Sequence, residues 1–476
     1  MVIEKLPQKE ILQFRSSSAF GIDRLAAYYG GCTLDICEYS LGIKLMWEST
    51  YHYAFSEVAG CLICRDEYDG LIYFDYPIAG EGGDVEAALE AIERYCLETD
   101  TPLRFTTLPE SVLGALMSRY DGVRVRQTYY CGDYFYRTED VRAFVGKKYA
   151  GQRNHIRRFY RGHPTARFRK LTREDLPALK KFASRFAATF QKQGSEALTE
   201  REAAFSIIRE NPTSLFRIGC MEIDGEIVGV ALGEKCGNTL VEHIEKALAA
   251  EYEGVYPALF QAFVTAFGDD CAYVNREDDA ADRGLRTSKM QYHPAHISKK
   301  FDVDVENILY TLREIPVLQT ERLTLDAITP RDAVPYGALC MDDDRNRYWG
   351  YDYRDDATGR VDGAYFCRVA EEDFQDRRAV NFAVRHRGEM IGEVVLYRFD
   401  NRGGAEIGVR ILPQYGGNGY GKEAFSAVAD WALYTLGLPR LYAKCFRQNT
   451  ASARLLSALM RQIGEDESML YFEKRI

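Results

Sequence analysis

Apolar residues in the last third of the chain alternate between the spacing of strands and that of helices. The runs 405–410 and 440–446 have the composition of strands, and apolar residues recur at helical spacing between them. That helix is indicated by Phe425, Val428, Ala429, Trp431, Ala432 and Leu436. Asn449, a residue type that caps helix N-termini, precedes another apolar-faced helix. The pattern predicts the order strand, turn, helix, strand, Asn-capped helix.

The same order of elements recurs twice upstream. In the middle of the chain we expect strands at 166–171, 215–223, 226–236, 239–247, 273–275 and near 296–305, with helices from Glu174, over about 198–210 and after a turn at 251–256. Residues 33–137 show a looser version with helices at 85–99 and from Pro109. We predict an α/β fold of mixed, mostly antiparallel sheets flanked by helices, divided into three modules at 1–145, 146–313 and 314–476.

A glycine-rich segment, Ile411 to Lys422, joins the strand at 405–410 to the following helix. Such a turn presents unpaired backbone N–H groups at the positive end of a helix dipole, where phosphate oxygens bind. Glycines allow the close approach that a Cβ would block. The spacing Gln414-x-x-Gly417-x-Gly419 differs from the dinucleotide fingerprint and lacks the ending of a P-loop. The alternative is that the glycines only form a tight loop.

The turn resembles the pyrophosphate-binding turn of the GNAT acyltransferases, so we expect three consecutive GNAT-like modules. The order Ala405-Glu406-Ile407-Gly408…Pro413-Gln414…Gly417-x-Gly419, with the opening Thr320 to Leu325, is similar to the branch that acetylates ribosomal-protein N-termini. The resemblance covers about 318–476 and implies transfer of an acetyl group from acetyl-CoA to a primary amine, in a small molecule or a peptide. The cofactor-binding residues that it implies are Val409, Ile411, Gln414, Gly416, Gly417, Asn418, Gly419, Gly421, Lys422, Asn449 and Ser452.

Acyl transfer from a thioester to an amine needs a base for the ammonium, a donor for the oxyanion and a proton for the leaving thiolate. The resemblance implies that Glu406 is the base; a solvent-facing strand carboxylate is the alternative. We expect the oxyanion donor to be a backbone N–H near 409–411. Asn449, the second catalytic candidate, can cap its helix and bind the pantetheine arm. Many GNAT enzymes have a Tyr acid seven residues later, but this chain has Leu456, so the sequence names no general acid.

The amine acceptor is expected at the loop over 342–354. Trp349, Tyr351 and Asp352 are candidates for lining a pocket for a cationic amine. The alternative is that these aromatic residues pack the loop onto the core.

Three blocks in the first two modules resemble a second family. The blocks lie at 146–159, 243–256 and 275–294, and they are similar to the soluble family named after the C-terminal domain of phosphatidylglycerol lysyltransferase, a tandem of GNAT-like folds. The resemblance covers about 15–310, with Ala281 in place of a glycine and Gln291 in place of a serine. Because the membrane-spanning half of the lipid-modifying enzymes is absent, we do not expect lipid lysylation. The alternative function is an aminoacyl-tRNA-dependent transferase or a small-molecule-binding protein that works through these two modules.

The middle module is not expected to bind coenzyme A. Glu251 stands where a diphosphate turn needs Gln or Arg, and a carboxylate repels a diphosphate. We expect instead a polar second site, or a salt-bridge network that joins the modules. Its residues would be His243, Glu245, Lys246, Asn275, Arg276 and Lys289. The segment from Arg142 to Lys170 has ten Lys or Arg and no acid, so it could contact tRNA, but we favour a solvated helix with acidic neighbours.

Composition adds few constraints. The chain has 476 residues, 46% of them hydrophobic, and no apolar run long enough to span a membrane. The N-terminus lacks the apolar core of a signal peptide, and twelve cysteines without regular spacing favour reduced thiols in the cytoplasm. Cys61-x-x-Cys64 has no second pair nearby, so we expect no metal. A net charge of −10 argues against nonspecific nucleic-acid binding by the whole surface.

Overall fold

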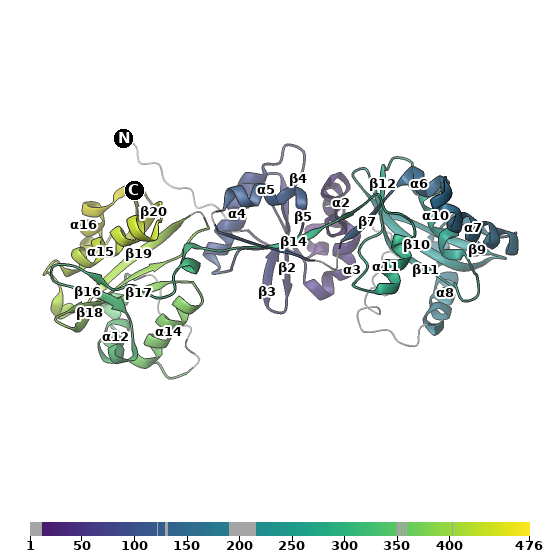
Figure 1. The fold of residues 1–476 in the computed structure, drawn as a ribbon. Coiled ribbons are helices and arrows are strands. Elements are labelled where there is room, and N and C mark those ends of the chain that lie inside the picture. The colour runs from purple at the N-terminus through teal and green to yellow at the C-terminus, as the bar shows by residue number, and fades with distance from the viewer. Residues whose placement is uncertain are drawn as a thin grey trace.

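The computed structural model describes residues 12–476 except 121, 129–131, 190–215, 350–353, 355, 356, 358 and 402. Three sheets follow one another along an elongated molecule, and the sheet of the N-terminal residues lies between the other two (Figure 1). The α/β fold with mostly antiparallel sheets flanked by helices is confirmed. The helix predicted over about 198–210 lies outside the described residues.

The first sheet has the strand order β1-β2-β3-β5-β14-β6, and β4 also pairs with β2. Its strands are β1 (Ala54–Val58), β2 (Cys61–Tyr68), β3 (Leu71–Phe74), β4 (Ile78–Ala79), β5 (Arg104–Pro109), β6 (Val123–Gln127) and β14 (Lys300–Val305). The helices around it are α1 (Ser17–Phe20), α2 (Ile22–Gly31), α3 (Leu41–Tyr51), α4 (Val85–Glu98) and α5 (Glu110–Arg119).

The second sheet has the order β13-β7-β12-β11-β10-β9-β8. Its strands are β7 (Asp133–Arg137), β8 (Arg167–Lys170), β9 (Phe216–Ile223), β10 (Glu226–Cys236), β11 (Thr239–Ala247), β12 (Tyr273–Asn275) and β13 (His296–Ser298). Its helices are α6 (Thr138–Ala143), α7 (Ala150–Gly162), α8 (Leu176–Thr189), α10 (Val255–Phe267) and α11 (Arg283–Met290).

The first two sheets exchange strands, and this changes the module boundary expected at 145. β7 precedes that boundary but pairs with β12 and β13 of the second sheet. β14 follows the second sheet in sequence but inserts between β5 and β6 of the first. The single strand expected near 296–305 is therefore two strands in two sheets. Hydrophobic periodicity identifies a strand but not its partner, so the exchange could not be foreseen from local pattern.

The third sheet runs β15-β16-β17-β18-β19-β20-β22-β21. Its strands are β15 (Leu318–Gln319), β16 (Thr324–Ala327), β17 (Val380–His386), β18 (Glu389–Tyr397), β19 (Gly404–Ile411), β20 (Arg440–Phe446), β21 (Arg461–Glu465) and β22 (Met469–Arg475). Its helices are α12 (Ala333–Cys340), α13 (Asp343–Asn346), α14 (Gly363–Gln375), α15 (Tyr420–Asp430) and α16 (Thr450–Leu459).

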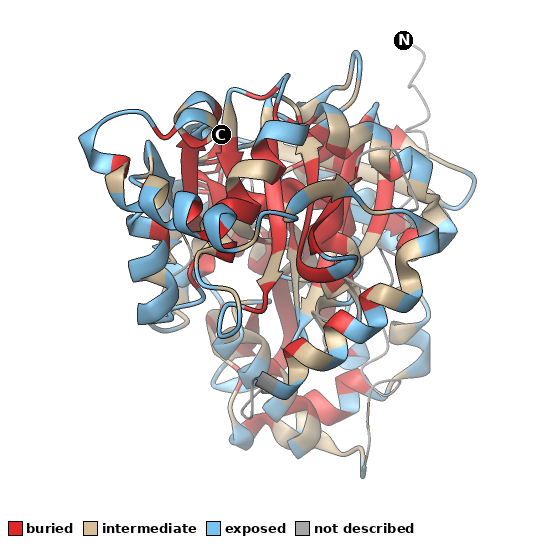
Figure 2. Ribbon diagram, turned by 90° about the vertical axis from the view of Figure 1, so that its right-hand side faces the viewer, coloured by how far each residue is buried: buried red, intermediate tan, exposed pale blue. Residues whose placement is uncertain are grey.

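Helices cover both faces of the third sheet. Phe425 and Val428 of α15 share one hydrophobic cluster with Phe382 of β17, whereas Leu339 of α12 and Phe366 of α14 form a cluster on the opposite face. The central strands β17 and β18 are therefore buried along nearly their whole length, and the buried residues concentrate in the strands in Figure 2. Each such side chain contributes about 1.5–3 kcal/mol by leaving water. Among the described residues, none of the helices is both long and apolar enough to cross a membrane.

Candidate functional site

The turn between β19 and α15 has the geometry of an anion site. Gly417 and Gly419 have φ angles of +79° and +81°, which favour glycine. Within the described part of the chain, the backbone N–H groups of 417–419 have no acceptor, whereas the Glu423 N–H donates to the Gly419 carbonyl at 3.1 Å in the first turn of α15. A Cβ built on Gly417 would meet no atom within 4 Å. An open row of N–H donors therefore lies at the positive end of a helix.

Arg322, which the sequence analysis did not single out, lies against this turn. Its Nη1 donates to the Asn418 carbonyl at 3.0 Å, and its guanidinium pairs with Glu423 of α15 at 2.6 Å. The guanidinium also lies 4.8 Å from the centre of the Tyr420 ring. Arg322 fixes the backbone of the turn and adds a positive charge beside the open N–H groups. Arg322 lies in the Thr320 to Leu325 segment that resembles the family. Nothing in the sequence indicates that its side chain contacts a turn about a hundred residues later.

Strands β19 and β20 separate after Glu406, before β19 reaches the glycine turn. They pair in parallel only from Gly404 to Glu406, whereas β18 pairs with β19 as far as Ile411. The edge of β19 that faces β20 therefore has no strand partner over 407–411 in the described residues. The backbone groups of Val409 and Ile411, expected at the site, lie on this unpaired edge.

The loop after α12 covers the opening between the two strands. Trp349 packs directly on Gly408 of β19, where a Cβ would lie 2.9 Å from the indole ring, and Arg410 lies 4.5 Å from the centre of that ring. The ring of Tyr348 is 5.7 Å from that of Phe446 on β20. The loop thus contacts both strands that separate. Tyr351 and Asp352, the other acceptor candidates, lie outside the described residues.

Glu406 lies on the same face of β19 as Gly408, at the last pair before the strands separate. Its side chain is 15% exposed and lies between Lys444, at 3.2 Å, and Arg398, at 3.7 Å. The Oε2 atom is buried and accepts no hydrogen bond from the described residues. Burial and the Glu406 carboxylate raise the pKa of Tyr397 on the neighbouring strand. The carboxylate therefore belongs to an enclosed polar group rather than to the solvent-facing side of the sheet.

Asn449 caps α16 as expected. Its side-chain oxygen accepts a hydrogen bond from the Ser452 N–H at 3.1 Å. Leu456, at the position of the family's usual acid, is buried in the core of the module. Leu456 therefore packs in the core and has no acidic proton to donate to the leaving thiolate.

A second candidate site lies between the first two modules, where a cavity of about 1420 Å³ opens. Four of the six residues named from the sequence line it: His243, Glu245, Lys246 and Arg276. The other two are buried behind its wall. Asn275 donates to Asp133 at 2.7 Å, and the Lys289 ammonium donates to backbone carbonyls of 276–278.

Strands β11 and β12 separate in the same way as β19 and β20 of the third sheet, and Arg276 spans the gap between them. β11 and β12 pair in parallel only from Thr239 to Val241. Beyond this, the Arg276 guanidinium reaches back to Glu242 at 2.7 Å and to Glu245, both on β11. Burial raises the pKa of Glu245 to about 8, although Arg276 lowers it. Ion pairs therefore fill the gap between β11 and β12, whereas the equivalent gap between β19 and β20 is open.

His243 is held between two carboxylates at the cavity wall. Its Nε2 lies 2.8 Å from Glu234 and its Nδ1 lies 2.7 Å from Glu277. Burial lowers the pKa of the imidazole, but the hydrogen bonds to both carboxylates outweigh it and raise the pKa to about 10. His243 is therefore a cation at neutral pH and a member of the wall rather than a free base.

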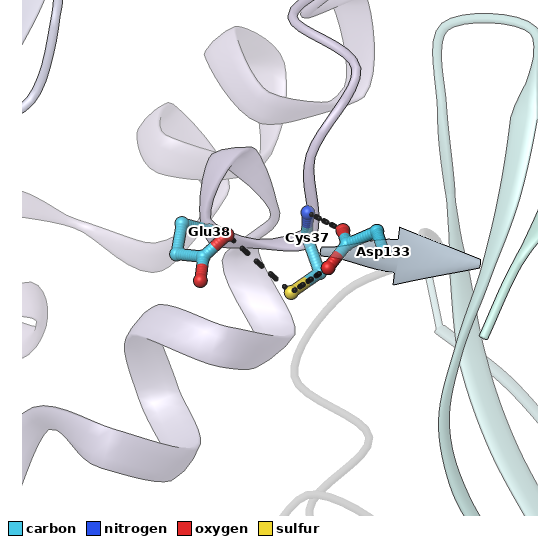
Figure 3. A group of neighbouring side chains, drawn as sticks. All are labelled: Cys37, Glu38 and Asp133. Atoms are coloured by element: carbon cyan, nitrogen blue, oxygen red, sulfur yellow. Dashed lines mark hydrogen bonds between the residues drawn. The ribbon is translucent and has the colours of Figure 1, made fainter. Parts of the chain in front are cut away.

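Cys37, Glu38 and Asp133 form a buried group at the junction of the first two modules (Figure 3). The Cys37 sulfur lies 3.5 Å from an oxygen of each carboxylate, so its one S–H can donate to either of them. The Lys300 ammonium of β14 lies 2.7 Å from Glu38 and 2.8 Å from Asp133, so it already supplies the positive charge that the carboxylates need. Burial raises the pKa of Glu38 to about 7, in spite of Lys300. This group is a set of ion pairs that joins the exchanged strands.

Comparisons with known proteins agree with this geometry. The family model described as "Phosphatidylglycerol lysyltransferase, C-terminal" matches residues 33–303. The chain belongs to this family. The model described as "Acetyltransferase (GNAT) domain" matches residues 322–459, so the third module is a GNAT domain and the chain is an acyltransferase. The family match spans both exchanged strands up to residue 303, which indicates that the first two modules are one structural unit.

The curated relatives are named N-acetyltransferases. "Uncharacterized N-acetyltransferase YoaA" of Bacillus subtilis (strain 168) is 31% identical over 144 residues, which are 30% of this chain and 80% of the relative. "Uncharacterized N-acetyltransferase p20" of Bacillus licheniformis is 29% identical over 146 residues, 30% of this chain and 82% of the relative. A conserved protein of unknown function from Bacteroides thetaiotaomicron VPI-5482 is 20% identical, covers 62% of this chain and all of its own length, and has a TM-score of 0.57, which shows the fold.

In this lysyltransferase-like unit, neither corresponding helix start offers an open anion site. Asp84 caps α4 by accepting the Ala87 N–H at 3.1 Å, so a carboxylate occupies the position of an anion. At the start of α10, a Cβ on Gly254 would lie 2.6 Å from the His155 carbonyl, because α7 packs against the turn. Glu251 is paired with Arg185 at 2.6 Å. Of these three starts, all within the described residues, only that of α15 is open.

Half of the ten cations in the basic segment of the same unit are paired with acids. Five of its cations form ion pairs: Arg142 with Asp269, Lys148 with Asp140, Arg158 with Glu253, Arg167 with Glu222 and Arg169 with Asp175. This agrees with the interpretation of a solvated surface with acidic neighbours.

Proposed function

We propose that the GNAT domain of this chain moves an acetyl group from acetyl-CoA to a primary amine. The observation that carries the proposal is the open row of N–H donors at the start of α15, next to the edge of β19 that has no partner. The donors suit a diphosphate, and the unpaired edge suits an extended arm that hydrogen-bonds like a strand. The N-acetyltransferases among the relatives support the reaction class.

The residues of the site divide the work as follows. Acetyl-CoA supplies an acyl group already activated as a thioester. The N–H groups of 417–419 bind the diphosphate, and Arg322 stabilises the turn. The N–H groups on the unpaired edge near Val409 donate to the oxyanion. Glu406 accepts the proton of the ammonium, directly or through water, because its buried Oε2 is free of hydrogen bonds among the described residues.

Trp349 and Tyr348 line the path by which the amine reaches the thioester, since they contact the two strands that separate, β19 and β20. Water supplies the proton of the leaving thiolate, because Leu456 carries none and the thiol has a pKa near 8.5.

The experiment is to incubate the full chain with acetyl-CoA and a panel of amines and peptides, and to follow free thiol. Thiol release that depends on an amine, with mass spectrometry showing an acetylated amine, is the expected result. Absence of acetyl-CoA binding by calorimetry at millimolar concentrations would contradict the proposal.

A second candidate function rests on the charge of the cavity between the first two modules: it binds a small cationic molecule. The carboxylates that line it are Glu38, Asp66, Glu242, Glu245, Glu253, Glu277, Asp278, Asp282 and Asp302. The cations in the described lining are Lys246, Arg276 and His243, and the last is already held by Glu234 and Glu277. The Oε1 atoms of Glu242 and Glu245 are buried and have no hydrogen-bond partner in the described residues. Such atoms favour a donor in the cavity.

An aromatic wall adds to the case for a cation. Trp47, Tyr51, Tyr53 and Tyr68 line the cavity, with ring centres 5.4–6.2 Å apart in neighbouring pairs. Aromatic faces attract ammonium groups.

The test compares 1,5-diaminopentane with 1,5-pentanediol, which has the same length and no charge, by thermal shift without acetyl-CoA. A stabilisation by the diamine alone is expected, and it should fall in Glu245→Gln but persist in Trp349→Ala. Equal shifts with the diol, or a shift lost only in Trp349→Ala, would assign the effect to another site.

A further inference from the structure

The first module reaches the GNAT site through one arginine. The Arg398 guanidinium, at the end of β18, donates to Glu98 at 2.6 Å through Nη2. Its Nη1 lies 3.7 Å from the Oε2 of Glu406. Glu98 is the last residue of α4, about three hundred positions away in sequence, so two modules share this cation. In Figure 1, α4 is the helix of the middle sheet on the side of the third module.

We propose that Glu98 is a positioning residue for the acetyl-transfer reaction: it holds Arg398 away from Glu406 and so preserves that carboxylate as a base. The inference rests on the proposed function of the GNAT domain. It assigns a catalytic task to the docking of the first module, whose own helix start is closed to a diphosphate.

The balance of charge around Glu406 explains why this matters. The groups that face it are Tyr397 at the end of β18 and Arg398 directly after it, Lys444 from β20, Tyr471 from β22 and Glu98 from α4. Lys444 already pairs with Oε1 at 3.2 Å. A second cation on Oε2 would complete the ion pairing of the carboxylate and weaken it as a proton acceptor.

Neutralising Glu98 has two effects on Glu406, and both favour its charged form. Arg398 loses its closer partner and is free to close on Oε2, and a nearby negative charge disappears. Both changes stabilise the charged carboxylate. In Glu98→Gln we therefore expect the acid limb of the pH–rate profile to move down by about one pH unit. We expect kcat to fall about 3- to 10-fold, because a weaker base transfers the proton less well, with the KM for acetyl-CoA unchanged.

Asp100 provides a matched control. It lies two residues after Glu98 and faces Arg378 of the same GNAT domain at 4.0 Å, and no contact links it to Glu406 in the described residues. Asp100→Asn removes a carboxylate at the same junction, on a longer and more exposed contact, and should leave the pH profile in place. An equal shift of the pH profile in both variants, or no shift in Glu98→Gln, would overturn the proposal.

A second readout does not depend on turnover. With glutamate labelled at the side-chain carboxyl carbon, the Glu406 signal is assigned by its loss in Glu406→Gln, and its titration is followed by NMR. A lower midpoint in Glu98→Gln than in Asp100→Asn supports the proposal, and equal midpoints contradict it. If no amine is acetylated, the proposed function fails while this comparison still decides the role of Glu98.

Discussion

Replacing Gly417 by glutamate is the most direct test of the diphosphate site. Gly417 has a φ of +79°, and a Cβ there would meet no protein atom within 4 Å. The added side chain therefore enters the space in front of the open N–H groups rather than the core. We expect Gly417→Glu to fold and to lose acetyl-CoA binding.

Two contributions set the size of the effect. A residue with a Cβ costs about 1–2 kcal/mol in the left-handed region, so a modest fall in the melting temperature is expected. A carboxylate about 4 Å from a phosphate oxygen is repelled by about 4 kcal/mol at an effective dielectric of 20, which corresponds to roughly a thousandfold in Kd. Gly417→Gln has the same backbone strain and nearly the same volume without the charge, so it isolates the second contribution.

The assay is titration calorimetry of acetyl-CoA into each variant, with circular dichroism to confirm the fold. Wild type should bind best, the glutamine variant less well, and the glutamate variant below detection. Equal affinities for all three proteins would refute the assignment. Loss in both variants to the same extent would show that shape rather than charge governs the turn.

Three further predictions follow from single contacts. Arg322→Gln removes the cation that holds the Asn418 carbonyl, so acetyl-CoA affinity should fall about tenfold by calorimetry, while the exposed control Arg331→Gln should not change it. Gly408→Ala places a methyl group 2.9 Å from Trp349 and should raise the KM for the amine more than that for acetyl-CoA; an unchanged amine KM would remove Trp349 from the acceptor site. Burial raises the pKa of Asp66 to about 7, so this carboxyl contributes stability that is present below about pH 4 and is lost as the pH rises through 7. Asp66→Asn should therefore raise the free energy of unfolding at pH 8 by at most about 4 kcal/mol and much less at pH 4, whereas Glu67→Gln on the same strand should show no such dependence in urea titrations.

The elements that rest on local pattern were predicted well from the sequence. The strand expected at 440–446 is β20, and those at 226–236 and 239–247 are β10 and β11, with the same bounds. Asn449 caps α16 because its side chain accepts the N–H of Ser452, three residues on, which is a local interaction. Glycines and alternating apolar residues carry this information in a short window.

What the sequence could not supply is the pairing of distant segments. Lys300 closes the group around Cys37 from 263 positions away, and Arg398 meets Glu98 from 300 positions away. The cavity between the first two modules is lined by residues far apart in sequence, from Cys37 to Asp302. The motif residues His243 and Arg276 pointed to that cavity, but most of its aromatic wall, Trp47, Tyr51 and Tyr68, comes from α3 and β2 of the first module. Periodicity specifies which side of a strand is buried and leaves its neighbours unspecified.

In two of the sheets, a pair of parallel strands separates after a short paired stretch, and the two gaps are occupied differently. In the third, β19 and β20 separate after three paired residues, and the side chains of Val409 and Ile411 on the open edge are apolar and pack against the cluster that contains Phe425 of α15. In the second, β11 and β12 separate after three paired residues too, but Arg276 and two glutamates occupy the gap. A charged bridge and acidic residues before the helix disfavour a diphosphate, so we expect the second sheet to face a cationic ligand instead. In this proposal the fold provides the gap, and the side chains at two or three positions along its edge decide which charge it accepts.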